Sequence, residues 1–498
     1  MAEAQPPLES DLPVDSIGKK SASGIMWTTA LNIGGRALSN LISQLVLARV
    51  LLPEDFGVVG LAYTISGFFS VLTGFGIEQV FQQRRPRMHM WATQAFALSL
   101  GLATTVAVAM AVYAPIGARL YHNPEVTKLV WVVALSLPLS ALGTVPTAQL
   151  KSLLRFKFLA VYSSIELIAS QTLTVALALY GMGALSFVLP LPLAALIRAI
   201  VFWRVAPMHL RPRRRARGWR RMMSRGVAAF GVSIVNTSIG QGDYVTLGLI
   251  APAPVVGIYY FAFKLAAQPV MLLAGNFMGV LRPALVAMSG DPTRQCNAAL
   301  KTGKLLGLLT APLCLMQAAV AEPLLHLLFG ERWNASIPLV QILSLGLSID
   351  SVAWAAGAFL ESRGQFSKSF TYQLITMPFF FIFVGAGGLL ASATGVALGV
   401  AAYYLSHPVF LTTIVFRKAG VGWRRILSCF YVPLGLAGPT IGGSYLVGRL
   451  PVFDGMELVH IAIPLALGGP LYLLAVRLVT PELFGEVLAK IPGPWRKR

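Results

Sequence analysis

The sequence has few charged residues and few cysteines, and it lacks a nucleotide-phosphate loop. Only 12% of its 498 residues are charged and its mean hydropathy is +0.70, which excludes a soluble globular domain of this length. The three cysteines, at positions 296, 314 and 429, follow no metal-ligand spacing and predict no disulfide framework. No G-x-x-x-x-G-K-[ST] motif is present, which excludes nucleotide hydrolysis by that route.

The sequence also lacks the residue patterns of an active site. Its six histidines form no ligand cluster, and no Ser/His/Asp or paired-carboxylate arrangement suggests catalysis. The net charge of +21 would favour nucleic acid only if a soluble module carried a basic face, and the sequence contains no such module. We therefore expect no catalytic residue, metal, cofactor or nucleic-acid partner.

Long apolar runs dominate instead. Runs of about 20 residues recur from end to end, which predicts an all-α polytopic membrane protein rather than an outer-membrane barrel. We count about 14 spans. Their expected limits are 23–48, 55–81, 91–114, 127–148, 159–181, 184–203, 226–250, 255–281, 302–321, 337–360, 369–390, 394–416, 427–448 and 457–477.

The basic residues between these spans predict the orientation. With the N-terminus inside, about thirty of the 40 basic residues fall on the inner side, as the positive-inside rule requires. This pattern predicts cytoplasmic N- and C-termini and an even number of spans. The long inner connection 208–226 is an orientation signal that also contacts anionic lipid, with docking of a cytoplasmic partner as the alternative.

A weak internal repeat divides the chain. An offset of 200 residues aligns Gly57 with Gly257 and Arg36 with Asn236, and both copies carry a proline-containing outer turn. The repeat predicts two six-helix lobes around a site, followed by an additional helix pair. The expected units are a disordered tail (1–22), an N-lobe (23–204), a basic cytoplasmic loop (205–225), a C-lobe (226–418), two further spans (419–478) and a cytoplasmic tail (479–498).

The first span carries a polar stripe with a charge near its middle. Thr29, Asn32, Arg36, Asn40 and Ser43 share one helical face. An arginine at mid-bilayer costs roughly 2.5 to 3.5 kcal/mol on insertion scales, so this face is expected to line a wet cavity. We interpret Arg36 as a cationic contact for an anionic substrate group.

Spans seven and eight repeat this arrangement. Asn236, Gly240 and Asp243 form a narrow strip in span seven, and Tyr260, Lys264 and Gln268 form one in span eight. The alternative for Asp243 and Lys264 is that the two charges, on adjacent helices, neutralise each other.

Four further charges lie within or near spans. Glu166 and Arg198 are expected either to form a helix-to-helix ion pair or to extend to the membrane surface. Asp350 has no obvious partner nearby in the sequence, so it is either a proton-exchanging group or a protonated packing residue. Glu78 is expected at a wet inner mouth.

Two G-x-x-x-G spacings occur in the C-terminal spans, Gly395/Gly399 and Gly438/Gly442. The spacing lets helix backbones approach closely, and we expect close helix contacts here rather than dimerisation.

Leu51 to Arg85 resembles the second span of the polysaccharide flippases of the MOP exporter superfamily. The resemblance is carried by Leu52-Pro53-Glu54-Asp55-Phe56-Gly57, by Gly74-Phe75-Gly76-Ile77 and by Gln82-Gln83-Arg84-Arg85. Supporting segments are Leu154-Arg155-Phe156-Lys157-Phe158, Gly240-Gln241-Gly242-Asp243 and Gly257-Ile258-Tyr259 to Lys264. Glu78 and Gln79 depart from the small residues expected at the end of span two.

The resemblance implies two six-helix lobes around a partly cationic cavity with alternating access in the bacterial inner membrane. It also implies an undecaprenyl-diphosphate-linked oligosaccharide as substrate and coupling to protons or sodium. Arg36 and Lys264 would meet the diphosphate, and Asp243 and Asp350 would couple the ion. Membrane lipids, a polysaccharide polymerase and a chain-length regulator are the other expected partners.

Two other functions would require different sequence features. A drug exporter of the same superfamily would favour an acidic cavity, which Arg36 and Lys264 argue against. A membrane-bound polysaccharide polymerase would be expected to have a substantial external loop bearing catalytic Arg or His residues, and none of the expected outer connections is long enough.

Overall fold

The computed structural model describes residues 35, 37–73, 88–153, 155–207, 216–453 and 455–490, and these ranges contain helices and no strand. The first part comprises α2 (Ala37–Val50), α3 (Pro53–Thr73), α5 (Met88–Leu120), α6 (Glu125–Leu142), α7 (Thr144–Ser152), α8 (Phe156–Leu179), α9 (Leu185–Val188) and α10 (Pro190–Val205). The second comprises α11 (Ala216–Ile250), α12 (Ala253–Ala266), α13 (Gln268–Ala287), α14 (Pro292–Phe329), η4 (Glu331–Ser336), α15 (Ile337–Leu347), α16 (Asp350–Ser362) and α17 (Phe366–Lys418). The last comprises α18 (Trp423–Ala437), η5 (Gly438–Gly442), α19 (Gly443–Gly448), η6 (Pro451–Phe453), α20 (Glu457–Ile463), η7 (Pro464–Gly468), α21 (Gly469–Val479) and α22 (Pro481–Lys490).

The protein is therefore an all-α polytopic membrane protein. Among the described residues, 10 helices are long and apolar enough to cross a membrane, or 11 if Glu331–Leu347 and Asp350–Ser362, which are bent by 42°, form one span. The expected count of about 14 is not confirmed, because α2 and α11 do not meet this criterion and α17 is counted once although it covers two of the expected spans.

The element α17 (Phe366–Lys418) consists of two antiparallel helices joined by a sharp break. The chain reverses at Ala391 and Ser392, and Ser392 has a φ of 49°. Beyond this break the backbones touch: a β-carbon on Gly395 would collide with the carbonyl oxygen of Gly387, and one on Gly399 with that of Phe383. The predicted close helix contact is confirmed here.

The second G-x-x-x-G spacing behaves differently. Gly438 and Gly442 bound the π-helical turn η5, and added β-carbons there would meet no atom of the described residues. The prediction of a close contact at this pair is wrong, because here the glycines fall in a local widening of the helix rather than on a packed face.

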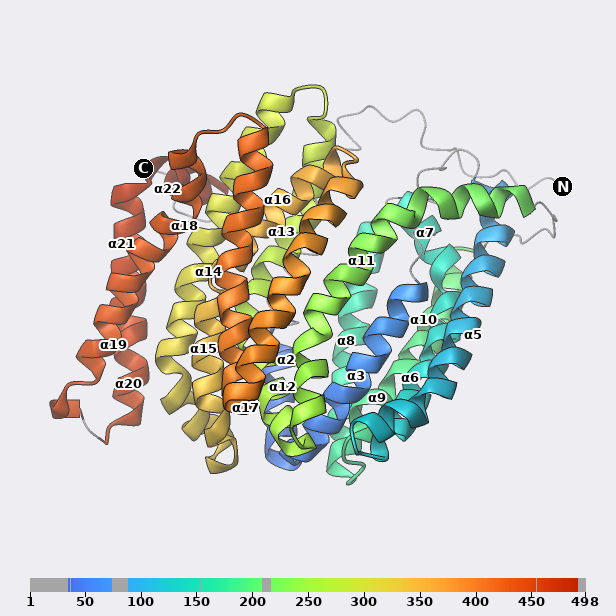
Figure 1. Cartoon of the computed structure of the whole chain (residues 1–498), viewed down its shortest axis with the longest axis horizontal. Coiled ribbons are helices and arrows are strands. Elements are labelled where there is room, and N and C mark those ends of the chain that lie inside the picture. Colours follow the sequence, from blue (N-terminus) through green and yellow to red (C-terminus); the bar gives the residue numbers. More distant parts are fainter. Residues whose placement is uncertain are drawn as a thin grey trace.

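The helices form two packed groups, which we call the N-terminal group (α2 to α10) and the C-terminal group (α11 to α17). In the first, α5 and α3 pack on α6, and α2 packs on α8; in the second, α16 and α15 pack between α14 and α17. The groups approach each other at the lower end of Figure 1 and diverge towards its upper end.

The two groups meet through the first turns of α3 and α12. A β-carbon on Gly57 would occupy the position of the Ala253 carbonyl oxygen, and one on Gly257 the position of the Pro53 carbonyl oxygen. The two contacts are equivalent under the offset of 200 residues that the sequence repeat suggested, which relates Gly57 to Gly257 and Pro53 to Ala253. We call this end, where α3 and α12 begin and η4 lies, the sealed end.

The helices beyond Lys418 pack on the outside of the C-terminal group. Helices α18 and α20 and the turn η5 contact α14, and α18 also contacts α21. In Figure 1 these helices form one edge of the molecule, with α22 at the end opposite the sealed end.

Candidate functional site

A cavity of about 390 Å³ lies between the two groups, and we call it the central cavity. Its walls come from α2, α3, α8 and α10 on one side and from α12 and α13 on the other. Its polar lining residues are Asn40, Gln44, Tyr63, Ser170, Gln171, Thr174, Tyr260, Lys264 and Gln268. Four of the predicted substrate-binding residues are therefore brought together, namely Asn40, Tyr260, Lys264 and Gln268.

Lys264 supplies the positive charge of the central cavity. It lies in the last turn of α12, and its ammonium nitrogen is 5.4 Å from the ring centroid of Tyr260, one turn earlier. Among the described residues no carboxylate forms an ion pair with it. An ammonium with only an aromatic face beside it retains hydrogen-bond donors for a ligand in the cavity.

Helix α8 contributes polar residues that the sequence analysis did not select. Gln171 donates from its side-chain nitrogen to the side-chain oxygen of Asn40 on α2 at 3.1 Å, and Ser170 and Thr174 line the same wall. The sequence does contain a pattern that indicates this polar wall, because Glu166, Ser170 and Thr174 recur every four residues and therefore share one face of the helix.

An aromatic cluster lies at the base of the central cavity, towards the sealed end. The buried indole of Trp333 packs against Phe56, with ring centroids 5.1 Å apart, and against Phe261, at 4.1 Å. Phe56 also lines the cavity. The indole nitrogen donates to the carbonyl oxygen of Ala48 at 2.9 Å, so η4 is fixed to the end of α2.

Two arginines, one from each helix group, form further hydrogen bonds across the sealed end. Arg49 Nε, in the last turn of α2, donates to the carbonyl oxygen of Leu328 at 3.0 Å. Arg332, in η4, donates to the carbonyl oxygen of Leu51 at 3.2 Å. Both bonds connect the N-terminal group to the C-terminal group, and both must break if the groups separate at this end.

Asp243 is buried away from the central cavity. It lies on α11 with 2% of its surface exposed, and it accepts a hydrogen bond from the Tyr259 hydroxyl at 2.7 Å and another from the Tyr244 backbone nitrogen at 2.9 Å. The alternative that Asp243 and Lys264 neutralise each other is wrong, since the carboxylate takes its partners from the tyrosine and the backbone.

A second cavity of about 330 Å³ lies within the C-terminal group, between α11, α12, α13, α15, α16 and α17. It contains the other two predicted site residues on these helices, Asn236 and Asp350. Asp350 is 8% exposed and accepts a hydrogen bond from the indole nitrogen of Trp354 at 2.9 Å. The expectation that Asp350 lacks a partner nearby in the sequence is therefore wrong; the donor lies one helical turn later.

His407 also lines the second cavity. Both ring nitrogens are buried without a hydrogen-bond partner among the described residues, as is the side-chain oxygen of Gln373. The imidazole stacks on Tyr403, with centroids 5.1 Å apart and planes 14° from parallel. Arg282 and Glu361 form an ion pair of 3.3 Å in the same lining. Sequence reasoning missed His407 because a lone apolar-flanked histidine carries no pattern.

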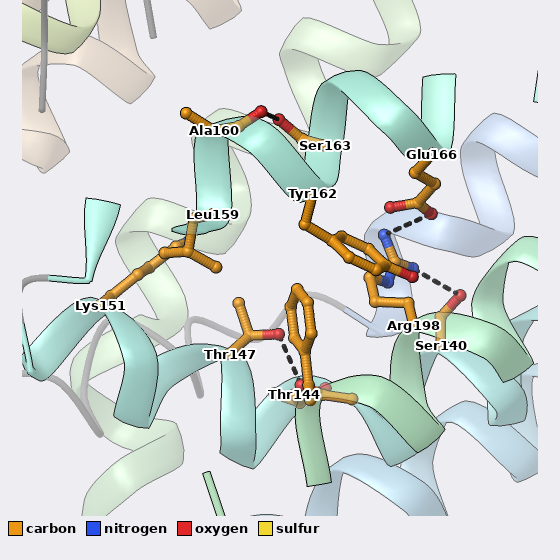
Figure 2. Close-up of a pocket in the computed structure, with 12 residues that line it drawn as sticks. Ser140, Thr144, Thr147, Lys151, Leu159, Ala160, Tyr162, Ser163, Glu166 and Arg198 are labelled. Atoms are coloured by element: carbon orange, nitrogen blue, oxygen red, sulfur yellow. Dashed lines mark hydrogen bonds and ion pairs between the residues drawn. The ribbon is translucent and has the colours of Figure 1, made fainter. Parts of the chain in front are cut away.

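A third cavity, of about 490 Å³, lies in the N-terminal group between α6, α7, α8 and α10. Arg198 and Glu166 form an ion pair there, with Arg198 Nη1 3.5 Å from Glu166 Oε1. Figure 2 shows Arg198 between the carboxylate of Glu166 and the hydroxyl of Ser140, which is 3.5 Å from Arg198 Nη2, with Tyr162 beside them. The predicted ion pair between the two helices is therefore observed.

Three predicted site residues, Asn32, Arg36 and Glu78, lie outside the described residues.

The three cysteines are buried and unpaired with one another. No group of three His, Cys, Asp or Glu side chains that could hold a metal ion occurs within the part of the chain that the structure describes.

The chain matches the profile of a known protein family over residues 46–338, more than half of its length. That family is described as "Polysaccharide biosynthesis protein". The chain belongs to this family. Its fold is shared with solved transporters of the MOP superfamily.

Curated relatives cover most of the chain. The lipopolysaccharide biosynthesis protein WzxC of Escherichia coli (strain K12) is 25% identical over 87% of this chain and 88% of its own length. The succinoglycan biosynthesis transport protein ExoT of Rhizobium meliloti (strain 1021) is 27% identical over 70% and 72% respectively. The teichuronic acid biosynthesis protein TuaB of Bacillus subtilis (strain 168) is 22% identical over 95% and 99%.

Solved structures share the fold. The lipid II flippase MurJ in an inward closed conformation has a TM-score of 0.71 and 13% identity, and the match covers 93% of this chain and 99% of that one. An inward-facing multidrug resistance MATE transporter has a TM-score of 0.59 and 13% identity over 77% and 96%. The match to MurJ covers a larger share of this chain than the match to the MATE transporter does.

Proposed function

We propose that the protein translocates an undecaprenyl-diphosphate-linked oligosaccharide across the bacterial inner membrane for exopolysaccharide or O-antigen synthesis. Membership of a polysaccharide biosynthesis family supports this assignment, as do curated relatives named for lipopolysaccharide biosynthesis and succinoglycan transport. The protein acts as a transporter and not as an enzyme.

The chemistry of the central cavity is the observation that carries the proposal. Lys264 provides an ammonium for the diphosphate, and the side-chain amides of Asn40, Gln171 and Gln268 provide donors and acceptors for sugar hydroxyls. The polyprenyl tail remains in the lipid throughout. Arg36, expected on the helix that α2 continues, is proposed as a second cation for the diphosphate.

Alternating access follows from the contacts between the two groups. At the sealed end, Trp333 and the Arg49 and Arg332 hydrogen bonds hold the groups together. We place this end at the outer surface and both termini in the cytoplasm, because the basic residues concentrate at the opposite helix ends. Opening the sealed end while the opposite ends approach would release the headgroup outside.

We propose that an ion drives this exchange. Asp243 and Asp350 are the candidate sites for protons or sodium, since each is a buried carboxylate with a neutral hydrogen-bond donor and no paired cation among the described residues. The Glu166–Arg198 pair and Glu78 are assigned to gating or structural support at the cytoplasmic side. Association with a polysaccharide polymerase and chain-length regulator remains part of the proposal.

Multidrug export is the second candidate, since MATE transporters share this fold. A cationic drug would require a carboxylate, and none lines the central cavity within the described part of the chain. The observation therefore favours an anionic substrate.

A reconstituted system tests the assignment. Full-length protein in liposomes would be given a fluorescent undecaprenyl-diphosphate oligosaccharide on one leaflet, and its appearance on the other leaflet would be followed with a membrane-impermeant glycosidase. We expect translocation above protein-free vesicles and no accumulation of a fluorescent cationic dye in parallel vesicles. Dye transport without oligosaccharide translocation would replace the proposal with the drug-export function.

A further inference from the structure

A basic pocket of about 700 Å³ lies where the C-terminal helices join the C-terminal group, away from the central cavity. Helices α14, α18, the end of α21 and α22 all line it. We propose that this pocket binds the phosphate headgroup of an anionic phospholipid of the surrounding membrane. The pocket shares no lining residue with the central cavity, so the inference goes beyond translocation of the substrate.

The charges of the pocket point to an anion. Among the described residues, its lining contains Arg294, Lys301, Lys304 and Arg425 and one carboxylate, Glu482, which leaves a net charge of +3 on these side chains. Lys304 on α14 and Arg425 on α18 both line this pocket. Cations from two helices therefore face one cavity, where a phosphate group would be attracted by both.

Hydrogen-bonding groups and an apolar base accompany these cations. Ser428, Asn297 and Thr480 contribute a hydroxyl, an amide and a second hydroxyl to the lining. Leu300 and Leu483 contribute apolar surface. This combination fits the phosphate and glycerol of a phospholipid better than it fits a fully hydrated ion.

The depth of the pocket agrees with the level of lipid phosphates. Lys304 lies twelve residues after Pro292, about 18 Å along α14, and immediately before the apolar run that begins at Leu305. Arg425 immediately precedes the apolar residues of α18, and α21 ends at Val479. All three helices pass from apolar to polar sequence at this pocket, as expected at the membrane interface.

Exposed apolar side chains beside the pocket provide a surface for acyl chains. Leu478 and Val479, at the end of α21, are 73% and 55% exposed, and Leu474, one turn earlier, is 52% exposed. In a membrane these side chains face lipid. A phospholipid with its headgroup among the cations can therefore lay its chains along α21 without entering the protein.

Helix α22 is the element that completes the pocket. It begins at Pro481, two residues after α21 ends, and its Leu483 and Phe484 pack on the small core formed by Leu308, Ala437 and Ile441. Binding of a lipid at this junction would hold the C-terminal helices against α14.

The proposal can be tested by lipid titration of the full-length protein in a neutral detergent. The shift in unfolding temperature would be measured against dioleoylphosphatidylglycerol, against dioleoylphosphatidylcholine and against inorganic phosphate. The test variant is Lys304→Gln/Arg425→Gln, and the matched control is Arg119→Gln/Lys128→Gln, which removes the same two charge types from exposed positions near the opposite helix ends. Neither pair belongs to the central cavity.

We expect phosphatidylglycerol to stabilise the wild-type protein more than phosphatidylcholine or phosphate does. Each basic residue near a membrane surface contributes about a fivefold factor, so the test variant should bind phosphatidylglycerol about 30-fold more weakly at low salt. The control should bind it like the wild type.

Three results would overturn the proposal: equal stabilisation by the two lipids, equal stabilisation by phosphate and phosphatidylglycerol, or the same loss in test and control variants. If the double variant does not fold, Arg294→Gln at the exposed rim takes its place, with about a fivefold loss expected. Because this experiment measures lipid binding, a negative result would overturn the lipid-site proposal without bearing on the translocation assay.

Discussion

Gly57 and Gly257 lie against each other where α3 meets α12, and the position of each missing β-carbon is filled by a carbonyl oxygen of the other helix. The two helices start at the same end of the molecule and run side by side. The contact is therefore reciprocal, and it joins the N-terminal group to the C-terminal group at the sealed end without any intervening side chain.

Adding a methyl group at either glycine should loosen the sealed end. Gly57→Ala and Gly257→Ala each place a β-carbon on backbone atoms that cannot move independently, so we expect a loss of about 1–3 kcal/mol of stability. Thermal unfolding in detergent would measure it. The control is Gly275→Ala on α13, where nothing lies within 4 Å of the new carbon and stability should not fall. Equal effects at all three positions would contradict the reciprocal contact.

Replacing the cavity cation should impair translocation. Lys264→Gln keeps a hydrogen-bonding side chain but removes the charge, and the loss of a charge-assisted bond predicts a decrease of about 10- to 100-fold in the rate measured in liposomes. Lys264→Arg should retain more activity, because it keeps the charge. A Gln variant as active as the wild type would exclude this lysine from substrate binding.

Asp243 and Lys264 should behave as independent sites. Because the Asp243 carboxylate is bonded to Tyr259 and not to the lysine, the effects of Asp243→Asn and Lys264→Gln on unfolding free energy should add, with an interaction within about 0.5 kcal/mol. The companion cycle of Asp243→Asn with Tyr259→Phe should show an interaction of about 1 kcal/mol or more. A larger interaction energy for Asp243 with Lys264 than for Asp243 with Tyr259 would instead support an ion pair between Asp243 and Lys264.

The Trp333 side chain should contribute to the seal in two separable ways. Trp333→Phe keeps an aromatic ring between Phe56 and Phe261 but removes the donor to Ala48, for an expected loss of about 1 kcal/mol. Trp333→Ala also empties the cluster and should cost about 3–5 kcal/mol. Thermal unfolding distinguishes the two, and similar losses for both variants would assign the whole effect to the hydrogen bond.

Local sequence patterns predicted the helices better than the contacts between them. Helical segments fall in every described part of the expected spans, because apolar runs and their polar breaks are properties of the chain itself. The repeat was useful for the same reason, since its offset paired Gly57 with Gly257 before any contact was known. Neither pattern reveals which side chain closes a cavity.

The site was predicted in part. The polar stripe of span eight led to Tyr260, Lys264 and Gln268, all of which line the central cavity. The pairing of Asp243 with Lys264 was wrong, because depth along neighbouring helices does not fix the direction of a side chain. Trp333 could not have been predicted, since its function depends on Phe56 and Phe261, residues brought to it only by the fold.

The contact between α3 and α12 has the form of an isologous interface, in which the same patch appears on both partners. A chain of half this length, carrying one such helix start, could build the same junction by pairing with a copy of itself. Duplication and fusion would then have joined the two copies, after which one could keep Pro53-Glu54-Asp55 and the other diverge to Ala253-Pro254-Val255 while the glycines stayed. The reciprocal geometry of this glycine pair therefore fits an origin by duplication of a chain that associated with a copy of itself.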